Sequence, residues 1–216
     1  MRKEVVMSVT VLWLGHAAFK LSSGGKNIYI DPWKIKESPH DATVVLVSHS
    51  HSDHFSASDI ARISGPNTKV VAPADVAAGQ KGYQSLSPGR QVTVSDVTIT
   101  AVAAYNPQKQ FHPKSKGWLG FIIQLDSKRI YYAGDTDITD DMKGIRDIDL
   151  ALLPIGGTFT MDPAEAAEAT GFIKPKTAIP CHWGDIVGSR SDAEKFAEAT
   201  NCDVQILAPG QTFILE

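Results

Sequence analysis

The sequence Thr43-Val44-Val45-Leu46-Val47-Ser48-His49-Ser50-His51-Ser52-Asp53-His54 joins a short apolar run to a dense polar cluster. The run from Thr43 to Val47 is mostly β-branched, which is typical of a buried strand. Ser56 follows the cluster as a candidate N-cap, which predicts a helix over 56–63 with Gly65-Pro66 as its stop. The cluster is therefore expected on a strand-to-helix loop, where a rigid scaffold holds polar groups at a surface cleft.

The polar cluster has the composition of a metal site. Four metal-competent side chains fall within positions 49–54, namely His49, His51, Asp53 and His54. Residues two apart in extended chain point to the same face, so the first three can converge, and a turn of the loop then brings in His54. Imidazoles with a carboxylate suit zinc or a similar divalent cation. A polar loop with chance histidines is the weaker interpretation, because three of the seven histidines of the chain lie in this window.

Length and composition limit the class of protein. The 216 residues are 43% hydrophobic and 21% charged, which predicts a globular protein with an ample core. We expect a single domain over 1–216 with two similar halves, roughly 1–105 and 106–216. The net charge of -3 provides no general field for nucleic acid or for a membrane surface, so neither partner is expected. The oligomeric state stays open, a homo-oligomer included.

Cysteine usage and the start of the chain favour a cytoplasmic protein. Cys181 and Cys202 are too few for a disulfide framework, which fits a reducing compartment. Met1-Arg2-Lys3-Glu4 and the apolar residues after it resemble a signal peptide, but Ser8 and Thr10 interrupt that run. No apolar run reaches the length of a membrane helix.

The remaining chain alternates strand and helix patterns in two similar series. Strands are expected at 9–14, 18–21, 27–30, 69–72, 120–125, 129–132, 149–154, 177–180, 204–207 and 212–215, with a β-rich segment over 91–102. A short helix is expected at 73–79, and longer ones from Asp162 to about Gly171 and from the capping-box pair Ser191 and Glu194 to Thr200. Each half runs strands first and helix later. This order favours an α/β fold in which two sheets pack face to face with helices outside.

More ligands must come from elsewhere, because one zinc needs about four. Three candidates each follow an apolar β run, as His49 does: His112, Asp135 and His182. Side chains at strand ends along one sheet edge can meet in one crevice. Each alone is a weak signal, since a lone loop histidine is usually solvated; their shared placement is the argument.

With these residues in view, the chain resembles the metallo-β-lactamase superfamily. The signature is His49-x-His51-x-Asp53-His54, and further matching segments occur in the expected order: 14–19, Ile30-Asp31-Pro32, 132–136, 153–157 and 180–183. The resemblance is nearest to a small single-domain branch of metal-dependent hydrolases related to the ascorbate-6-phosphate lactonases. It implies a four-layer αβ/βα sandwich of two mixed sheets and a site for two divalent metal ions, zinc first, with manganese, iron or nickel as alternatives.

The same resemblance assigns roles. It implies that His49, His51 and His112 hold one metal, that Asp53, His54 and His182 hold the other, and that Asp135 bridges them. Many relatives place the third histidine near positions 105–106, whereas His112 lies six residues past Asn106. His16 and Asp31 also end strands in the matching pattern. For Asp31 we expect a hydrogen bond to a ligand imidazole and for His16 a contact with substrate, against the alternative of a capped turn with a satisfied histidine.

The expected chemistry is metal-assisted hydrolysis of a small molecule. A hydroxide shared by two metals would attack a carbonyl or phosphoryl centre, with Asp53 and Asp135 as ligands and Asp53 steering protons. Lys109, Lys114 and Lys116 flank His112 in a segment without acidic residues, which predicts an anionic substrate such as a lactone or phosphate ester; scattered solvated lysines explain it equally well. Competing hypotheses are a phosphodiesterase or nuclease, a diiron oxidoreductase on the same fold, and a non-catalytic metal-binding module.

Overall fold

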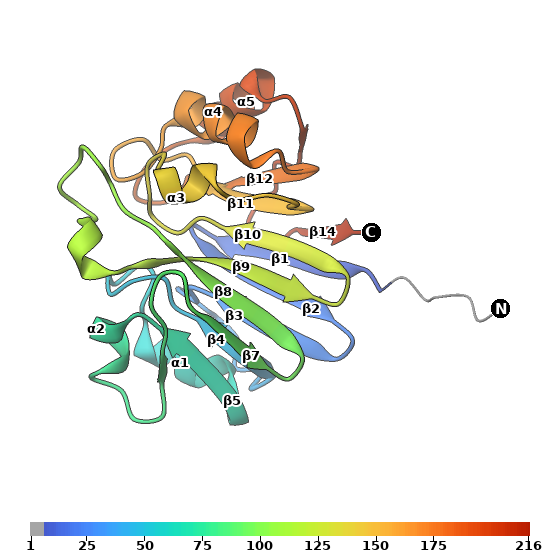
Figure 1. Cartoon of the computed structure of the whole chain (residues 1–216). Helices are drawn as coiled ribbons and strands as arrows, with labels where there is room; N and C mark the ends of the chain where they lie inside the picture. The colour runs from blue at the N-terminus through green and yellow to red at the C-terminus, as the bar shows by residue number, and fades with distance from the viewer. Residues whose placement is uncertain (1–6) are drawn as a thin grey trace.

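Two mixed seven-stranded sheets face one another in the computed structural model, which describes residues 7–216 (Figure 1). The basic start of the chain, Met1–Glu4, lies outside these residues. Both sheets combine an antiparallel meander with a run of parallel strands. The expected α/β sandwich of two sheets is confirmed.

The first sheet contains the N-terminal strands and the last strand of the chain. Its order is β14-β1-β2-β3-β4-β5-β6. The bounds are β1 Val9–Gly15, β2 Ala18–Ser23, β3 Lys26–Ile30, β4 Ala42–Leu46, β5 Ser64–Ala72, β6 Gln84–Ser85 and β14 Thr212–Leu215. β14 pairs with β1, so the end of the chain returns to the sheet in which the described chain begins.

The second sheet contains the middle of the chain. Its order is β13-β12-β11-β10-β9-β8-β7. The bounds are β7 Gln91–Val94, β8 Val97–Ala103, β9 Leu119–Leu125, β10 Lys128–Tyr132, β11 Leu150–Pro154, β12 Thr177–Cys181 and β13 Asp203–Val204. The chain therefore passes from one sheet to the other between residues 85 and 91, ahead of the division near residue 105 that the sequence suggested.

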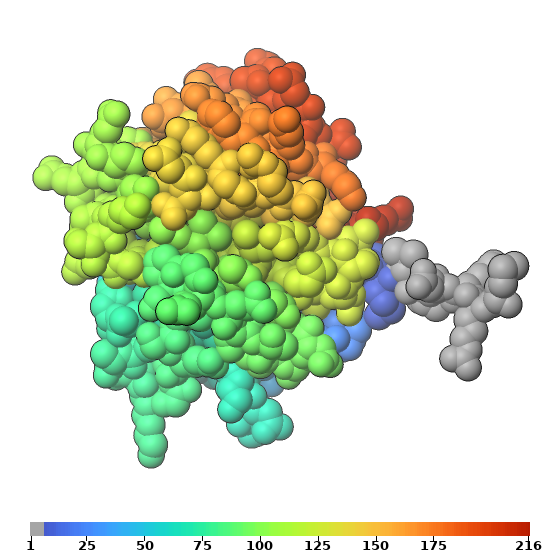
Figure 2. All heavy atoms as spheres, viewed as in Figure 1, coloured from blue at the N-terminus to red at the C-terminus, as the bar shows by residue number. Residues whose placement is uncertain are grey.

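Helices cover the outer faces. They are α1 Ala57–Ile63, α2 Ala74–Ala77, α3 Asp140–Lys143, α4 Pro163–Ile173 and α5 Arg190–Ala199, with a 3-10 turn, η1, at Lys114–Lys116. In Figure 1, α1 and α2 lie at the bottom beside the first sheet, and α3, α4 and α5 lie at the top beside the second. With all atoms drawn, residues coloured green to orange form most of the near face and hide the blue strands of the first sheet (Figure 2). No helix within residues 7–216 is long and apolar enough to cross a bilayer.

Burial follows the strand patterns. In β1 the side chains of Val9, Val11 and Trp13 are fully buried and alternate with partly exposed ones, because one face of this strand looks into the core. In β11 and β12 every residue is buried, since helices cover the other face of these parallel strands.

The helix expected over 56–63 is confirmed: Ser56 caps α1, which ends at Ile63, and Gly65-Pro66 follow in β5 at a register shift against β4. A bulge tolerates proline because the ladder is interrupted there. Ser191 does not cap α5, which starts at Arg190 after Ser189. The hydroxyl of Ser189 donates to the side chain of Asp192, so the capping box that Ser191 and Glu194 suggested does not form.

The aromatic core between the sheets gives the first prediction. Phe121 is fully buried, and its ring stacks 6.5 Å from that of Tyr132, which contacts Phe19 of the opposite sheet. We expect Phe121→Ala to lower the free energy of unfolding by about 3–5 kcal/mol through lost contacts and a cavity. Denaturant unfolding measures this. Ile214→Ala, at an exposed position of β14, is the control and should stay within about 0.5 kcal/mol of the parent; equal losses would contradict the placement of Phe121.

Candidate metal centre

The candidate site lies where strands of both sheets end at the same edge. β1, β3 and β4 run in one direction in the first sheet, and β8, β10 and β12 do so in the second. The residues that follow these strands are His16, Asp31, the cluster 49–54, the loop with His112, Asp135 and His182. Leu119 N–H donates to the carbonyl of Ser48 at 3.0 Å, which ties the second sheet to the loop of the first at this point. Strand direction thus gathers side chains that are far apart in sequence.

One group of ligand atoms comes from three histidines. His49, His51 and His112 each offer a ring nitrogen, and these atoms lie within 4.8 Å of one another. His49 Nε2 and His51 Nδ1 are 3.1 Å apart. His112 is 1% exposed, so the loop that carries it folds inward over the site. The structure therefore brings His112 to the cluster despite its displaced position in the sequence.

A second group lies beside the first. It consists of His16, Asp53, His54 and His182, whose ligand atoms also fall within 4.8 Å of one another. Asp53 Oδ2 is 3.5 Å from His54 Nε2 and 4.0 Å from His182 Nε2. His16 Nε2 donates to Asp53 Oδ2 at 3.0 Å.

Asp135 lies between the two groups. Its Oδ2 is 3.3 Å from His112 Nε2 and 3.2 Å from His182 Nε2, and its Oδ1 is 3.4 Å from His54 Nε2. Its Oδ2 is also 4.0 Å from His49 Nε2. One carboxylate therefore faces histidines of both groups, which is the position that a bridging ligand requires.

Unpartnered polar atoms show that these residues fit a cation. His54 Nε2, His112 Nε2, His182 Nε2 and Asp135 Oδ1 are all buried without a hydrogen bond within residues 7–216. Leaving several buried polar atoms unpaired is strongly unfavourable unless something else satisfies them. Imidazole nitrogens and carboxylate oxygens aimed at a common centre are a donor set for zinc and other divalent transition metals. The histidines and acids present match a metal-binding site.

The electrostatics put the acids in the state that binds metal. Although burial acts to raise it, the hydrogen bond from His16 lowers the pKa of Asp53 to about 2. Burial likewise opposes ionisation of Asp135, but the imidazoles of His182 and His54 hold its pKa well below the ordinary value. Burial lowers the pKa of His49 well below its usual range, which keeps that imidazole neutral. Burial acts to lower the pKa of His54, but the charge of Asp135 and the hydrogen bond to Asp31 raise it well above its usual range. Ionised carboxylates and neutral imidazoles are the forms that coordinate metals, so a cation at His54 would displace its proton.

Asp31 forms hydrogen bonds to the loop that carries the cluster 49–54. It is fully buried and accepts hydrogen bonds from Ser48 N–H at 2.7 Å, His54 Nδ1 at 2.7 Å and Tyr132 Oη at 2.6 Å. The Ser48 hydroxyl donates to it at 2.5 Å and lies 2.9 Å from His49 Nδ1. Occupying the Nδ1 atoms in this way leaves Nε2 of both histidines directed at the site. Asp31 has the contact with a candidate ligand imidazole that the sequence suggested.

Asn106 explains why the third histidine works from a displaced position. Its Oδ1 accepts from both the backbone N–H of His112 and the ring Nδ1 of the same residue, at 3.1 and 2.8 Å. The backbone N–H of Asn106 in turn donates to the His112 carbonyl at 2.8 Å. The amide Nδ2 donates to the carbonyl of Phe159 at 3.0 Å. The residue that stands where many relatives carry the histidine thus orients His112 instead.

His16 lies behind Asp53 rather than in the cleft. It is 3% exposed, and its ring packs 4.0 Å from that of His182. Its carbonyl accepts from the backbone N–H of His182 at 2.8 Å. Its ring nitrogen is directed at Asp53 and His16 does not line the cleft, so contact of His16 with substrate stays a prediction. Its place favours a positioning role.

The three lysines are engaged elsewhere. Lys109 Nζ lies 2.7 Å from Asp137 and 2.6 Å from the Thr160 carbonyl. Lys114 Nζ contacts the Tyr105 hydroxyl at 3.2 Å and lies over the Tyr105 ring, and Lys116 lies near the Trp118 ring. None of the three lines the cleft beside the ligands. These contacts fit the alternative of scattered, individually paired lysines, and the role of Lys109, Lys114 and Lys116 in anion binding stays a prediction.

Several residues of the site escape sequence reasoning. Trp118 is buried, its ring lies 5.0 Å from that of His49 and 4.9 Å from that of His51, and its Nε1–H donates to Asp75. Tyr132, the last residue of β10, reaches Asp31 across the sheets. Both look like ordinary core aromatics in the sequence. Their spacing from the histidines gives no signal of contact.

Gly156 shows how close the packing around His182 is. A Cβ at this glycine would lie 2.7 Å from the His182 carbonyl and 3.0 Å from His182 Nδ1. Such distances require the neighbour to shift. The absence of a side chain at Gly156 therefore allows the loop after β11 to approach the histidine after β12.

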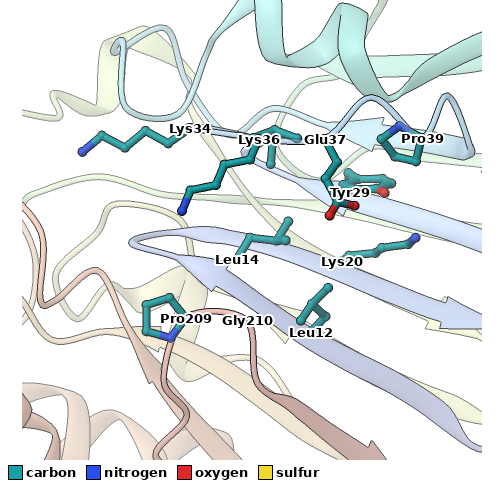
Figure 3. Close-up of a pocket in the computed structure, with 11 residues that line it drawn as sticks. Leu12, Leu14, Lys20, Tyr29, Lys34, Lys36, Glu37, Pro39, Pro209 and Gly210 are labelled. Carbon is teal, nitrogen blue, oxygen red and sulfur yellow. The ribbon is translucent and has the colours of Figure 1, made fainter.

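Two hollows of the surface differ in volume and in the residues that line them, and the smaller one contains the candidate ligands. A cleft of about 240 Å³ opens onto His51, Asp53, His112 and Asp135. A larger hollow of about 380 Å³ lies on the outer side of the first sheet. In Figure 3, Leu12 and Leu14 of β1 border it with Pro209, and Lys20 lies along it. Lys20 is paired with Asp41 at 2.6 Å, and no histidine of the described chain lines this hollow.

Comparison with known proteins agrees with this chemistry. The family model of the beta-lactamase superfamily domain matches residues 10–182. A UPF0173 metal-dependent hydrolase from Thermococcus kodakarensis is 37% identical, covering 94% of this chain and 98% of the relative. The solved structure of Igni18, a metallo hydrolase from Ignicoccus hospitalis, has a TM-score of 0.79 at 28% identity, covering 97% and 99% of the two chains. A solved structure from Parabacteroides distasonis has a TM-score of 0.83 at 27% identity, covering 95% and 94%.

The contacts of Asn106 give a prediction about metal affinity. Asn106→Ala removes the acceptor that orients the His112 ring, so we expect metal affinity to fall about 10–100-fold, as for other outer partners of ligand histidines. Competition with a chromophoric chelator measures the affinity. Asn67→Ala, at an exposed position on β5, is the matched control. Unchanged affinity in Asn106→Ala would show that His112 does not depend on this contact.

Proposed function

The chain belongs to the beta-lactamase superfamily as a metal-dependent hydrolase, and we propose that it uses two divalent cations, zinc in first place, to hydrolyse a carbonyl or phosphoryl bond of a small molecule. Manganese, iron or nickel would suit the same ligands. The observation that carries the proposal is the arrangement of two ligand groups around one buried carboxylate, Asp135.

The two groups divide the ligands between two cations. His49, His51 and His112 would hold one, and Asp53, His54 and His182 would hold the other. Asp135 would contribute to both, because its oxygens face His112 on one side and His54 on the other. His16 would position Asp53 through their hydrogen bond. These assignments leave every unpartnered Nε2 atom of the site with a role.

Hydrolysis is the chemistry that such a site favours. When bound, divalent cations lower the pKa of water toward neutrality and polarise a carbonyl or phosphoryl oxygen. Asp53 lines the cleft and is ionised at neutral pH, so it can accept a hydrogen bond from the attacking water and orient it. Asp31, through its hydrogen bonds with Ser48 and His54, keeps the loop of residues 49–54 rigid while the substrate binds.

A covalent nucleophile from the chain has little support. Ser52 lines the cleft, but no hydrogen bond joins its hydroxyl to a histidine within the described residues. The Ser48 hydroxyl lies beside His49 and His54, but it is buried and donates to Asp31. Cys181 is 1% exposed, and burial raises the pKa of its thiol well above the usual range, which disfavours the reactive thiolate. Water is therefore the favoured nucleophile.

Two features favour small-molecule hydrolysis over a diiron oxidoreductase or a nuclease. In diiron oxidoreductases that resemble this chain, a carboxylate stands at the position of His51, so an imidazole there favours zinc-type hydrolysis. A nuclease needs cations along a groove for the phosphate backbone. No lysine or arginine of residues 7–216 lines the cleft. Small-molecule hydrolysis is therefore the preferred activity.

Metal content tests the division of ligands. We expect the zinc-loaded protein to hold two equivalents per chain, and His51→Ala and His182→Ala to hold about one each, because each variant removes a ligand from a different group. Elemental analysis after gel filtration measures the content. One equivalent in the parent protein would contradict the dinuclear assignment.

Loss of a central ligand tests the activity. We expect His49→Ala to lose metal and hydrolysis together, by more than the 10–100-fold typical of an outer partner. A panel of esters, lactones and phosphodiesters provides the assay. His40→Ala removes an exposed histidine whose ring lies 3.0 Å from the Ser64 carbonyl, away from the ligands, and serves as the control. Full activity of His49→Ala in zinc-free buffer would refute the proposal.

A further inference from the structure

The walls of the cleft differ in chemistry from its floor. The floor consists of metal-competent side chains, while the walls come from four separate loops and are apolar: Trp33, Phe111, Phe159 and Ile186. Phe111 and Phe159 meet edge to face, with ring centroids 4.8 Å apart and planes at 83°. The aromatic pair forms a firm surface directly beside His112, whose loop carries Phe111.

Two of these wall residues are unusually exposed for their type. Phe111 is 39% and Ile186 is 58% exposed, and both are among the few large hydrophobic side chains that residues 7–216 leave open to solvent. Exposed apolar groups that cluster at a cleft are typical of a ligand-binding surface. Folding alone gives no reason to leave them at the mouth of a polar site.

The backbone conformation at Ile186 is unusual, and hydrogen bonds of the turn fix it. Its φ is 65°, a left-handed conformation that a β-branched residue rarely adopts. The turn is fixed by the hydrogen bond from Val187 N–H to the Asp185 carbonyl at 2.7 Å and from Gly184 N–H to the Val187 carbonyl at 3.1 Å. Strained conformations of this kind cluster at ligand sites, because the surrounding structure must maintain them.

A salt bridge joins the two loops that flank this side of the mouth. Lys34 Nζ lies 2.5 Å from Asp185 Oδ2 and 4.0 Å from the centre of the Trp33 ring. The contact ties the loop of Trp33 to the loop of Ile186. It also occupies the ammonium group of Lys34, which is the lysine next to a wall residue in the sequence.

The charges around the cleft disfavour an anionic group on the wall side. The formal charges that line it are the carboxylates of Asp53 and Asp135, and no lysine or arginine within 7–216 does so. Lys109 is paired with Asp137, and Lys114 with Asp141 at 3.5 Å. An anionic substituent between Trp33, Phe159 and Ile186 would lose hydration, because the proposed cations lie at the floor beside the scissile centre and the Lys34 ammonium near Trp33 is paired with Asp185.

We propose that the cleft selects substrates with an uncharged aromatic or branched aliphatic group next to the scissile bond. The inference rests on the proposed hydrolase function and names its substrate class. Trp33, Phe111, Phe159 and Ile186 contact the apolar group, while the scissile centre lies over the histidine and aspartate floor. A cavity of about 150 Å³ holds benzene, so the cleft of about 240 Å³ accommodates one ring with a short linker.

A matched series of substrates tests the selection. The zinc-loaded protein is assayed with the acetyl, phenylacetyl and 4-carboxyphenylacetyl esters of one leaving group. We expect kcat/KM for the phenylacetyl ester to exceed both others by about tenfold or more, which is the scale on which apolar pockets discriminate. Equal values, or a preference for the carboxylated ester, would overturn the inference while leaving hydrolysis intact.

A charge placed on the wall provides the decisive variant. Ile186→Lys is expected to shift the ratio of kcat/KM between the phenylacetyl and the 4-carboxyphenylacetyl ester by about tenfold toward the anion. Ile214→Lys is the matched control, since Ile214 is an isoleucine of β14 that is 47% exposed and does not line the cleft. It should leave the ratio unchanged. An unchanged ratio in Ile186→Lys would contradict contact between this residue and the substrate.

A binding measurement separates this inference from the proposed function. Saturation-transfer NMR follows N-benzylacetamide and 4-(acetamidomethyl)benzoate, which need no turnover, on the parent protein and both lysine variants. We expect the neutral probe to bind the parent and Ile214→Lys, and to lose most of its signal with Ile186→Lys. If this pattern holds but no ester, lactone or phosphodiester is hydrolysed, the proposed function fails and the apolar wall stands. Equal binding of the neutral probe to parent and Ile186→Lys overturns the wall.

Discussion

The structure depends on one electrostatic constraint: buried imidazole nitrogens converge on the carboxylate of Asp135 without forming well-aligned hydrogen bonds to it. Nε2 of His54, His112 and His182 faces Asp135 at 3.2–3.4 Å, yet none of these contacts has the alignment of a hydrogen bond. Such a cluster is unfavourable as a set of isolated polar groups and becomes favourable around cations. The low pKa of Asp53 and of Asp135 agrees with this interpretation, because both acids remain ionised in a largely buried site. A polar core of this kind identifies a metal-dependent enzyme more directly than the size of any hollow.

Both sheets direct the ends of several strands toward the cluster of histidines and aspartates around Asp135. The parallel directions of β3 and β4 in the first sheet and of β10, β11 and β12 in the second bring their carboxyl ends to one edge. The chain takes unusual backbone conformations there: φ is 50° at His16, 43° at Asp31 and 58° at His182. Each of these residues directly follows a strand, and the left-handed turn directs its backbone across the edge rather than along it. Hydrogen bonds from Ser48, His54 and Tyr132 to Asp31 then hold the arrangement across both sheets.

The sequence predicts a site residue well when a ligand-type side chain directly follows a strand. It predicts poorly the residues whose place in the site depends on tertiary packing. His49 to His54 are recognisable because four candidate ligand side chains follow an apolar run, and Asp135 and His182 because they follow strands. His112 was a weaker candidate, since its loop wraps back through contacts with Asn106 that no spacing rule describes. The place of the lysines was not predictable, because proximity in sequence to His112 does not say which partner a long side chain contacts, and Lys109 pairs with Asp137. Trp118, Tyr132 and the wall of the cleft were missed, because an aromatic residue at an active site has the same local pattern as one in the core.

The central claim is that one chain holds two cations on either side of Asp135, and anomalous diffraction tests it most directly. Crystals of the zinc-loaded protein, measured on both sides of the zinc absorption edge, should show two peaks. One peak should lie among His49, His51 and His112, and the other among Asp53, His54 and His182, with Asp135 in contact with both. A single peak, or peaks remote from Asp135, would contradict the account.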